Sequence, residues 1–455
     1  MTRPATADVL ANVAHELDRL LSGADSELAS WYEAGGAGRQ PVHTAYVPAH
    51  RFGPETVRQW GAQALAAMDE FAPGPGELAD ATGLAPGVIA EVHPLVLAKL
   101  ARQPVEDLRI DFEDGYGTRA DDTEDAHARA AARSLVSVLC EDAAPSFMGL
   151  RCKSLEKDTR HRAVRTLQMF LGTLLENDRP PPQGFVITLP KVTSAAQVSA
   201  MAVLCERLEA AFAVTWPLGL LVFEIQVETP QVILGADGAA TIARCVHAAP
   251  GRLTGLHFGT YDYTASLGIA APYQSMEHPA ADYARAVMQV AAAGTDVQLS
   301  DGSTNVFPVG SRDDVIAAWR LHARLVRRSL ERGFYRGWDL HPAQLVSRYA
   351  ATYAFYREGF RDACDRIRGY TARAASGQEE PATARALGVF LTRALDCGAV
   401  TEGEIEGAAG LTAGALGLAA RTGRLPSPDT DGPAGSIPGS TRHNTVGPRT
   451  DAAAP

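Results

Sequence analysis

Short apolar runs alternate with longer amphipathic segments along most of this chain. Runs with the length and composition of β-strands centre near Tyr46, Ile110, Leu150, Ile187, Ile225, Leu256, Gln298 and Leu340. Segments with the apolar spacing of a helix lie between them, at residues 122–140, 158–177, 194–213, 230–247, 278–293 and 311–333. Strands that alternate with helices of this length indicate repeated βα units and a parallel sheet. Eight such units close a barrel, so the pattern predicts an α/β fold of the (β/α)8 TIM barrel type.

A barrel explains the spacing better than a doubly wound sheet does. A six-stranded doubly wound sheet would leave two of the predicted units unused. No Gly-x-Gly-x-x-Gly motif follows an early strand, so a dinucleotide-binding fold has no support. The first gap between strands, residues 52–105, is the longest and contains Pro-Gly-Pro-Gly at 73–76. We interpret it as one βα unit that carries an inserted excursion.

The same pattern divides the chain into four parts. Residues 1–40 contain an N-terminal helical segment, and residues 41–375 form the predicted barrel. Residues 382–424 are expected to form a small helical extension or lid. Residues 425–455 are rich in Pro, Gly, Ser and Thr, and we expect them to be disordered because they offer little apolar surface to bury.

Composition and charge narrow the class of protein. The 455 residues are 46% hydrophobic and 21% charged, as in a globular chain with a large core. The net charge of −11 disfavours a nucleic-acid partner, because such binding depends on Lys and Arg that neutralise phosphates. No signal peptide and no run of 18 apolar residues is found, so we expect a cytoplasmic protein without a membrane span. The six cysteines form no Cys-x-x-Cys pair and are expected to be reduced thiols.

Charged residues follow the predicted strands at the place where a barrel carries its active site. That place is the mouth formed by the carboxyl ends of the strands. Alternation along the second strand puts Asp111 and Glu113 on one face, with the apolar neighbours on the other. The next four strands end in, or are followed by, Arg151, Lys191, Glu228 and Asp262.

Each polar residue near a strand end has a simpler structural explanation when it is considered alone. An acid there is more often a helix cap or a salt-bridge partner, and a lone histidine is more often a packing residue. Residues of this kind are Asp114, Asp301, His257 and His341, and Glu224 and Gln226 are expected to form a buried hydrogen-bonding layer. So many ionisable groups around one rim nevertheless imply mutual pairing or a ligand, because unpaired buried charge is costly. Glu228 and Asp262 follow neighbouring strands and can share one hard cation.

Several motifs in one order resemble a known family. They are Leu-Arg-Ile-Asp-Phe-Glu-Asp (108–114), Leu-Arg (150–151), Leu-Pro-Lys (189–191), Glu-Thr-Pro (228–230), Gly-Thr-Tyr-Asp-Tyr-Thr-Ala-Ser-Leu-Gly (259–268) and His-Pro-Ala-Gln (341–344). This set is similar to the citrate lyase β-subunit and HpcH/HpaI aldolase group of the phosphoenolpyruvate/pyruvate-binding TIM barrels. Malate synthases share the Glu and Gly-x-x-Asp-Tyr elements. The resemblance covers about residues 43–345.

The resemblance implies a role for each site residue. Glu228 and Asp262 would hold Mg²⁺, with Mn²⁺ as the alternative, and oxygen ligands suit such a cation. Arg151 would bind the substrate carboxylate, since a guanidinium matches it with two hydrogen bonds. Gly259 and Thr260 are also expected to contact the substrate. Asp111 and Glu113 would orient Arg151 and a metal-bound water, and Lys191 would stabilise an enolate.

These roles lead to an expected function, with two alternatives. The resemblance implies a Mg²⁺-dependent carbon–carbon lyase of the aldolase type, which acts through the enolate of a 2-oxo acid or related acyl substrate. Its partners would be a small keto acid and further copies of itself, since relatives commonly assemble through their terminal helices. The general base stays unassigned, because Asp114 and Gly115 stand where some relatives have a histidine.

The first alternative is a lyase or condensing enzyme for a CoA thioester, of the citryl-CoA or malyl-CoA lyase or malate synthase kind. It would need a groove for adenosine diphosphate, and no Lys/Arg cluster near a strand end indicates one. The second alternative is a non-catalytic barrel with a regulatory or scaffolding role. In that case residues 382–424 would bind the partner.

Overall fold

The computed structural model describes residues 6–32, 38–176, 180–212, 219–374 and 381–425. Of residues 6–12 and 371–374 it describes the backbone alone. The tail predicted to be disordered therefore lies, from residue 426 on, outside the described residues.

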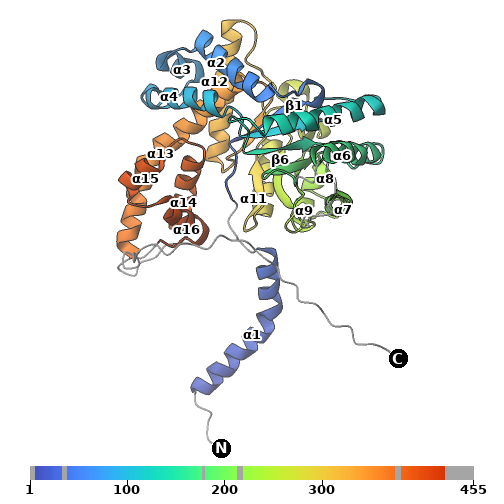
Figure 1. Ribbon diagram of the computed structural model, residues 1–455. Helices are drawn as coiled ribbons and strands as arrows, with labels where there is room; N and C mark the ends of the chain where they lie inside the picture. Colours follow the sequence, from blue (N-terminus) through green and yellow to red (C-terminus); the bar gives the residue numbers. More distant parts are fainter. Residues whose placement is uncertain (1–5, 33–37, 177–179, 213–218, 375–380, 426–455) are drawn as a thin grey trace, which may run out of the picture.

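Eight parallel strands form the predicted barrel (Figure 1). They are β1 (His43–Pro48), β2 (Asp107–Asp111), β3 (Phe147–Arg151), β4 (Phe185–Leu189), β5 (Val222–Val227), β6 (Leu253–Phe258), β7 (Gln298–Ser300) and β8 (Gly337–Asp339). From β1 to β7 each strand pairs with the next in sequence, β1 also pairs with β8, and β7 and β8 are the two edges. Two backbone hydrogen bonds join the remaining edges: Asp301 N–H donates to the Arg336 carbonyl at 2.8 Å, and Trp338 N–H donates to the Gly302 carbonyl at 3.2 Å. The α/β barrel predicted from the spacing is thus confirmed.

Helices connect the strands and cover the outside of the sheet. The long first gap holds three of them, α2 (Thr56–Phe71), α3 (Pro75–Thr82) and α4 (Pro86–Arg102). The later connections are α5 (Asp121–Val138), α6 (Arg160–Leu174), α7 (Ala195–Phe212), α8 (Pro230–Ile233), α9 (Thr241–His247), α10 (Thr260–Ser266), α11 (Pro279–Ala292) and α12 (Arg312–Glu331). At the start of α12, Ser311 and Asp314 bond each other's backbone N–H groups as a capping box.

Two expected elements differ from the structure. The segment predicted as one helix, 230–247, is split into α8 and α9 by a turn around Gly235 and Gly238. Gly238 has a φ of 78°, which favours glycine, and a Cβ at Gly235 would lie 2.7 Å from the Asp237 carboxylate. The last strand also ends at Asp339, so Leu340, the expected strand centre, follows the strand instead.

The inner and outer faces of the strands carry different side chains. On β5, Phe223, Ile225 and Val227 are fully buried among apolar neighbours. The residues between them, Glu224 and Gln226, are polar and equally buried. Alternation of this kind is what a strand between a helix layer and a barrel interior requires.

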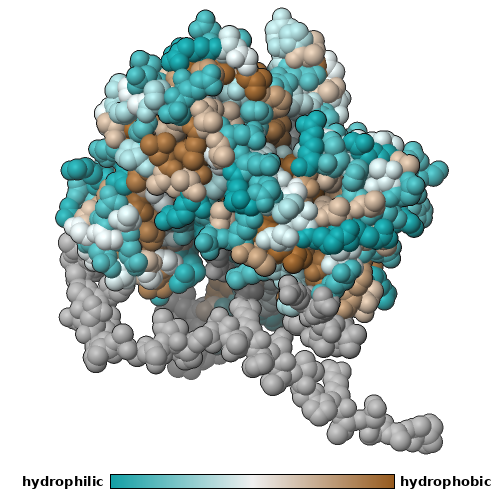
Figure 2. Space-filling view, turned by 45° about the horizontal axis from the view of Figure 1, so that its top comes forward, coloured by the Kyte–Doolittle hydropathy of each residue, from teal (hydrophilic) through white to brown (hydrophobic). Residues whose placement is uncertain are grey.

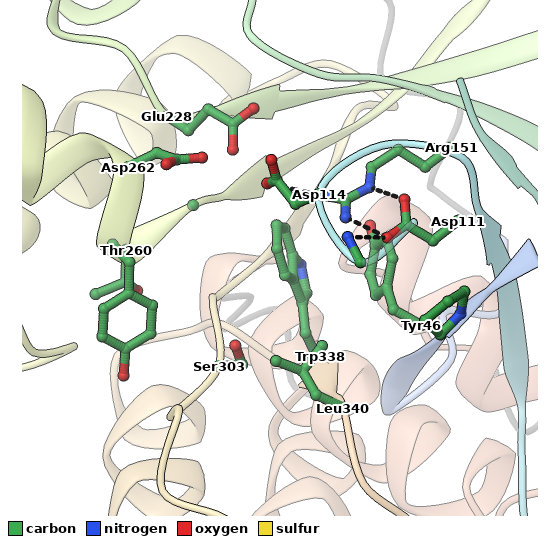
Figure 3. Close-up of a pocket in the computed structure, with 14 residues that line it drawn as sticks. Tyr46, Asp111, Asp114, Arg151, Glu228, Thr260, Asp262, Ser303, Trp338 and Leu340 are labelled. Atoms are coloured by element: carbon green, nitrogen blue, oxygen red, sulfur yellow. Dashed lines mark hydrogen bonds and ion pairs between the residues drawn. The ribbon is translucent and has the colours of Figure 1, made fainter. Parts of the chain in front are cut away.

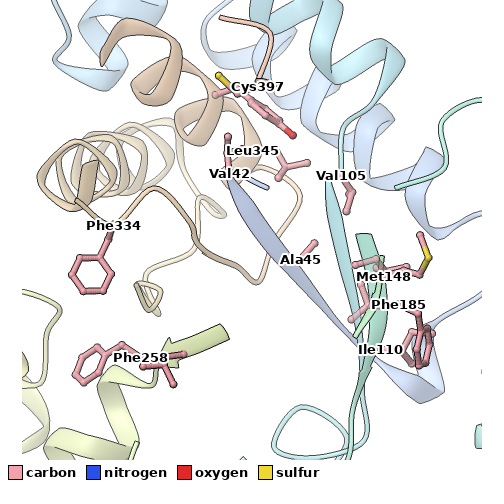
Figure 4. Close-up of a cluster of buried hydrophobic side chains, with 14 of the residues drawn as sticks. Val42, Ala45, Val105, Ile110, Met148, Phe185, Phe258, Phe334, Leu345 and Cys397 are labelled. Carbon is pink, nitrogen blue, oxygen red and sulfur yellow. The ribbon is translucent and has the colours of Figure 1, made fainter. Parts of the chain in front are cut away.

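The C-terminal helices belong to the same core as the barrel. The long helix α13 (Gln344–Ala374) follows the last strand, and α14 (Pro381–Asp396), α15 (Glu402–Ala409) and α16 (Ala413–Thr422) come after it. Cys397, Leu345 of α13 and Val42, which precedes β1, belong to one cluster of buried apolar side chains (Figure 4). All six cysteines are free thiols, and of these only Cys140 is exposed.

The first helix, α1 (Thr6–Trp31), projects away from the barrel (Figure 1). Its C-terminal end meets the body where Trp31 stacks on His247, with ring centroids 5.1 Å apart. Polar side chains cover most of the face seen in Figure 2, and apolar side chains gather there in smaller patches. Among the described residues no single helix has the length and apolar character of a membrane span. Helices α3 and α4 have that length and apolar character only when they are taken together, and they are bent by 110° relative to each other.

Candidate active site at the barrel mouth

A cavity of about 330 Å³ opens at the carboxyl ends of the barrel strands (Figure 3). Its lining consists of Tyr46, Pro48, Asp111, Asp114, Gly115, Arg151, Glu228, Gly259, Thr260, Tyr261, Asp262, Ser303, Trp338 and Leu340. Most of the residues expected at the site from the sequence are in this lining. The other two, Glu113 and Lys191, contact members of it.

Arg151, the last residue of β3, is held by carboxylates from the end of β2. Its Nε lies 2.6 Å from Asp111 Oδ1 and its Nη2 lies 2.7 Å from Asp111 Oδ2, which is a bidentate pair. Its Nη1 lies 3.2 Å from Glu113 Oε2. The guanidinium is almost completely buried, so these acids fix its orientation. The family resemblance implied that Asp111 and Glu113 orient Arg151 and a metal-bound water, and these roles stay predictions.

A tight turn after β2 places these acids. The Asp111 carboxylate accepts hydrogen bonds from the backbone N–H groups of Glu113 and Gly115, both at 2.9 Å. A Cβ at Gly115 would lie 2.7 Å from Asp111 Oδ2. The sequence Asp-Phe-Glu-Asp-Gly therefore forms a turn that only a residue without a side chain can close so near the carboxylate.

Carboxylates from three strand ends converge on Lys191. The Lys191 ammonium contacts Asp262, lies 3.3 Å from Asp114, and lies 3.7 Å from both Glu113 and Glu228. Its backbone has a φ of 54°, in the left-handed region, and its N–H donates to Glu228 Oε1 at 2.7 Å. Glu228 and Asp262 thus both lie within 4 Å of one ammonium nitrogen, which places their carboxylates on the same part of the mouth.

Glu228 and Asp262 reach this point from different local structures. Glu228 directly follows β5 and is buried against Gly259, where a Cβ would lie 2.6 Å from the Glu228 Cβ. Asp262 lies in the first turn of α10, a short helix that the sequence pattern did not predict. Within the described ranges no group of three or more His, Cys, Asp or Glu residues has the geometry to hold a metal. Two carboxylates, with coordination positions left for water and substrate, fit the way Mg²⁺ is usually bound.

The charges at the mouth are out of balance. Asp111, Glu113, Asp114, Glu228 and Asp262 surround two cations, the guanidinium and ammonium just described. Burial, reinforced by repulsion from Asp262, raises the pKa of Glu228 to about 7. Burial and the neighbouring Asp114 raise the pKa of Glu113 to about 8. Both shifts reflect carboxylates that lack sufficient positive charge around them.

The pKa of Lys191 shifts in the direction that favours the charged form of its side chain. Burial opposes the charge of the Lys191 ammonium, but the surrounding Glu228 and Glu113 outweigh burial and raise its pKa. Lys191 is therefore a fixed positive charge at neutral pH. Such an ammonium can stabilise an oxyanion, whereas a Schiff base would require it to lose its proton.

The two residues expected to contact substrate differ in what they offer. The backbone N–H of Gly259 donates to the Val227 carbonyl at 3.0 Å, so Gly259 contributes space and not a free donor. The Thr260 hydroxyl is buried and makes no hydrogen bond with any residue that the structure describes. Thr260 lines the cavity, but its hydroxyl oxygen packs against Gly302, where a Cβ would lie 2.5 Å from that oxygen.

The residues given structural explanations from the sequence lie outside the cavity lining. Glu224 pairs with Arg109 at 2.8 Å and with His257 at 2.7 Å, in a buried layer beneath the site. Asp301 is paired with Arg285 at 2.7 Å, and His341 Nδ1 accepts the Ala343 N–H at 3.2 Å. Asp114 is the exception, because it lines the cavity and contacts Arg151.

Several lining residues were not expected from the sequence, and the larger apolar ones among them include Tyr46, Trp338 and Leu340. Tyr46 was known only as the centre of the first strand, and Trp338 and Leu340 were not considered for the site. The available clue was Tyr46 itself, a large side chain with a polar tip within an apolar strand. Trp338 was missed because the last strand was predicted to centre two residues too late.

Comparison with known proteins places the chain in a family. The family model described as "Domain of unknown function (DUF6986)" matches residues 21–423. The chain belongs to this family. Among the curated proteins, none matches the sequence.

Solved structures were compared with this DUF6986 protein, and one of them superposes with a TM-score above 0.5. A citrate lyase from Burkholderia xenovorans LB400 superposes with a TM-score of 0.53 and 18% identity, covering 82% of this chain and 98% of that one. The Haloferax volcanii malate synthase magnesium/glyoxylate complex has a TM-score of 0.45 and 16% identity, covering 68% and 75%. The citrate lyase beta subunit complexed with oxaloacetate and magnesium from M. tuberculosis has a TM-score of 0.39 and 17% identity, covering 69% and 97%. The first of these likenesses shows that the chain shares the barrel fold of that protein.

Proposed function

We propose that this protein is a Mg²⁺-dependent carbon–carbon lyase of the aldolase type, which acts on a 2-oxo acid. The observation that carries the proposal is the charge at the mouth, where five carboxylates surround only Arg151 and Lys191. An anionic substrate is repelled by this excess unless a divalent cation accompanies it. Glu228 and Asp262 would hold that cation, and Mn²⁺ accepts the same oxygen ligands.

Arg151 would bind the carboxylate of the oxo acid. Asp111 occupies the Nε and Nη2 edge of the guanidinium, so the substrate would approach the outer hydrogens of Nη1 and Nη2. Lys191 would offset the negative charge that develops on the oxo oxygen. When bound, the divalent cation supplies Lewis acidity to the same oxygen.

Cleavage of a 4-hydroxy-2-oxo acid balances without any oxidant or reductant. The bond between C3 and C4 breaks, and its electron pair stays on C3 as an enolate. The proton of the C4 hydroxyl passes to a base, which leaves an aldehyde or ketone. A proton added to C3 completes the smaller 2-oxo acid. The reverse sequence forms the bond.

The thioester alternative finds no comparable support. Binding of the diphosphate in CoA calls for basic residues near the mouth. Among the described residues that line the cavity, Arg151 is the only basic one. A non-catalytic barrel remains as the alternative that the metal-binding experiment must exclude.

The experiment is calorimetric titration of Mg²⁺ into the full chain at about pH 8.5, where Glu228 is ionised. We expect saturable binding of Mg²⁺ to the wild type. The affinity should fall about tenfold or more in Glu228→Gln and in Asp262→Asn, because each variant replaces a charged carboxylate by a neutral amide of similar shape. Pyruvate should then bind to the Mg²⁺-loaded wild type. It should bind more weakly to Arg151→Lys, because the lysine keeps the positive charge but cannot donate the two parallel hydrogen bonds of a guanidinium.

Glu277→Gln is the matched control, because Glu277 pairs with Arg324 on the outer helices and lies outside the cavity lining. Its Mg²⁺ affinity should equal that of the wild type. A folded wild-type protein that binds neither Mg²⁺ nor pyruvate would favour the scaffold alternative. Equal Mg²⁺ binding by Glu228→Gln and the wild type would also exclude the proposed site.

A further inference from the structure

One wall of the cavity differs in kind from the carboxylate cluster. Tyr46 and Pro48 from the end of β1, and Trp338 and Leu340 from the end of β8, form an apolar surface. In Figure 3 the Trp338 indole and Leu340 lie apart from Glu228 and Asp262, with open space between them. The cavity thus has a charged half and a flat, largely apolar half.

Trp338 is held rigidly in this wall. Its ring packs on the ring of Tyr46, with centroids 4.9 Å apart. Its indole N–H donates to His257 Nδ1 at 3.1 Å, and His257 Nε2 lies 2.7 Å from Glu224. Burial lowers the pKa of His257, so the neutral ring that accepts from the indole is favoured. A side chain fixed by two neighbours, one of which is itself held by Glu224, offers a preorganised flat surface to a ligand.

Charge restricts what the apolar half can accept. Of the described residues that line the cavity, four are acids and Arg151 is the only base. In the proposed reaction, Arg151 is already engaged by the carboxylate of the oxo acid. A second anionic group, such as a phosphate or another carboxylate, would be repelled by these acids and would have no cation in the lining to pair with.

We infer that the part of the substrate beyond its 2-oxo acid group is uncharged, flat and apolar, an inference that rests on the proposed function. The structure fits a 4-aryl-4-hydroxy-2-oxo acid, which would yield an aromatic aldehyde and a smaller 2-oxo acid. Trp338 determines this specificity by packing on the aryl ring, and Tyr46 supports the indole from behind.

The test compares ligands with one head group and different tails. Pyruvate, 2-oxo-4-phenylbutanoate and 2-oxoadipate are titrated into the Mg²⁺-loaded full chain, and none of the three can be cleaved by the proposed reaction because each lacks the C4 hydroxyl. We expect the phenyl compound to bind about tenfold or more tightly than the other two, because it buries its ring against an aromatic wall. Trp338→Ala should remove that preference while pyruvate still binds.

A second variant, which adds a charge to the apolar half, tests the inference if Trp338→Ala does not fold. Leu340→Arg places a cation in the apolar half and should shift the preference from the phenyl compound to 2-oxoadipate. Val309→Arg is its matched control, because Val309 is exposed on the loop before α12 and lies outside the cavity lining. It should leave the ligand order unchanged.

The outcomes separate the two proposals. If pyruvate fails to bind to the folded, Mg²⁺-treated wild type, the proposed function itself is wrong. If pyruvate binds but the phenyl tail adds nothing, or 2-oxoadipate binds more tightly, the function stands and the aromatic specificity is overturned. A Leu340→Arg variant that retains the phenyl preference overturns it as well.

Discussion

At the scale of single residues, two glycines determine where carboxylates of the candidate site lie. Gly259 allows Glu228 to pack directly against the end of β6, since a Cβ there would be 2.6 Å from the Glu228 Cβ and 2.7 Å from its Oε2. Gly115 does the same for Asp111. In both cases the glycine makes room beside an acid. Neither Gly259 nor Gly115 has a positive φ, so neither is needed for backbone freedom.

Gly259→Ala therefore tests the proposed metal pair without removing a ligand. The backbone of Gly259, with a φ of −101°, accepts alanine. The added methyl should push the Glu228 carboxylate away from Asp262, and we expect Mg²⁺ affinity to fall about tenfold or more by calorimetry.

Gly87→Ala serves as the control, because nothing lies within 4 Å of a Cβ at that helical position. It should bind Mg²⁺ as the wild type does. A Gly259→Ala protein with unchanged Mg²⁺ affinity would contradict the assignment of Glu228 as a ligand.

At the scale of elements, a buried polar network joins β8 to the surrounding helices. Asp339 of β8 lies 3.0 Å from Arg348 of α13, 3.3 Å from His322 of α12 and 2.9 Å from His43 of β1. Burial, reinforced by Arg348, lowers the pKa of His322 although Asp339 opposes the shift. His322 is therefore neutral when the protein is folded near pH 7.

This network predicts a pH dependence of stability. A histidine whose folded pKa is below its unfolded value of about 6.5 binds a proton first in the unfolded chain. Its contribution is complete above about pH 6.5 and is lost as the pH falls towards the folded pKa. His322→Asn should flatten the fall in unfolding free energy between pH 6.5 and 5 by up to about 1.4 kcal/mol per pH unit.

Denaturant unfolding at several pH values measures that slope. His15→Asn is the control, because His15 is exposed on α1 and should leave the slope unchanged. Parallel stability curves for His322→Asn and the wild type would show that His322 does not titrate as expected.

At the scale of the whole molecule, α1 carries apolar surface that the barrel does not cover. Leu17, Leu20, Leu28 and Trp31 each expose more than half of their surface and lie on one stripe of the helix. Acidic side chains flank the stripe, which disfavours an anionic membrane or a nucleic acid as the partner. We expect α1 to pack against a second copy of this chain, in line with the assembly that the family resemblance implied.

The assembly is tested by light scattering coupled to size-exclusion chromatography. Replacing Leu17 and Leu20 by Glu should lower the molar mass of the full-length protein, because charge in the stripe opposes apolar packing. Replacing Ser22 and Ser26 by Glu adds equal charge to the opposite face of α1 and should leave the mass unchanged. Equal masses for all three proteins would rule out α1 as the contact.

Much of this protein follows from local patterns in its sequence. The spacing of apolar runs predicts the eight βα units, and the alternation along single strands predicts that Glu224 faces inward while Ile225 packs outward. Asp111, Arg151, Glu228 and Asp262 were expected at one mouth, because the carboxyl ends of parallel strands meet there. These are properties of the backbone repeat, which a few neighbouring residues determine.

Only the tertiary structure decided that the cavity has an aromatic wall on one side and a carboxylate cluster on the other. Tyr46 and Trp338 are far apart in the chain and stack only because β8 closes the barrel beside β1. Lys191 lies among carboxylates from β2, β5 and β6 because its left-handed backbone turns the chain back over the mouth. Contacts of this kind depend on the relative placement of whole strands, and no local periodicity encodes that placement.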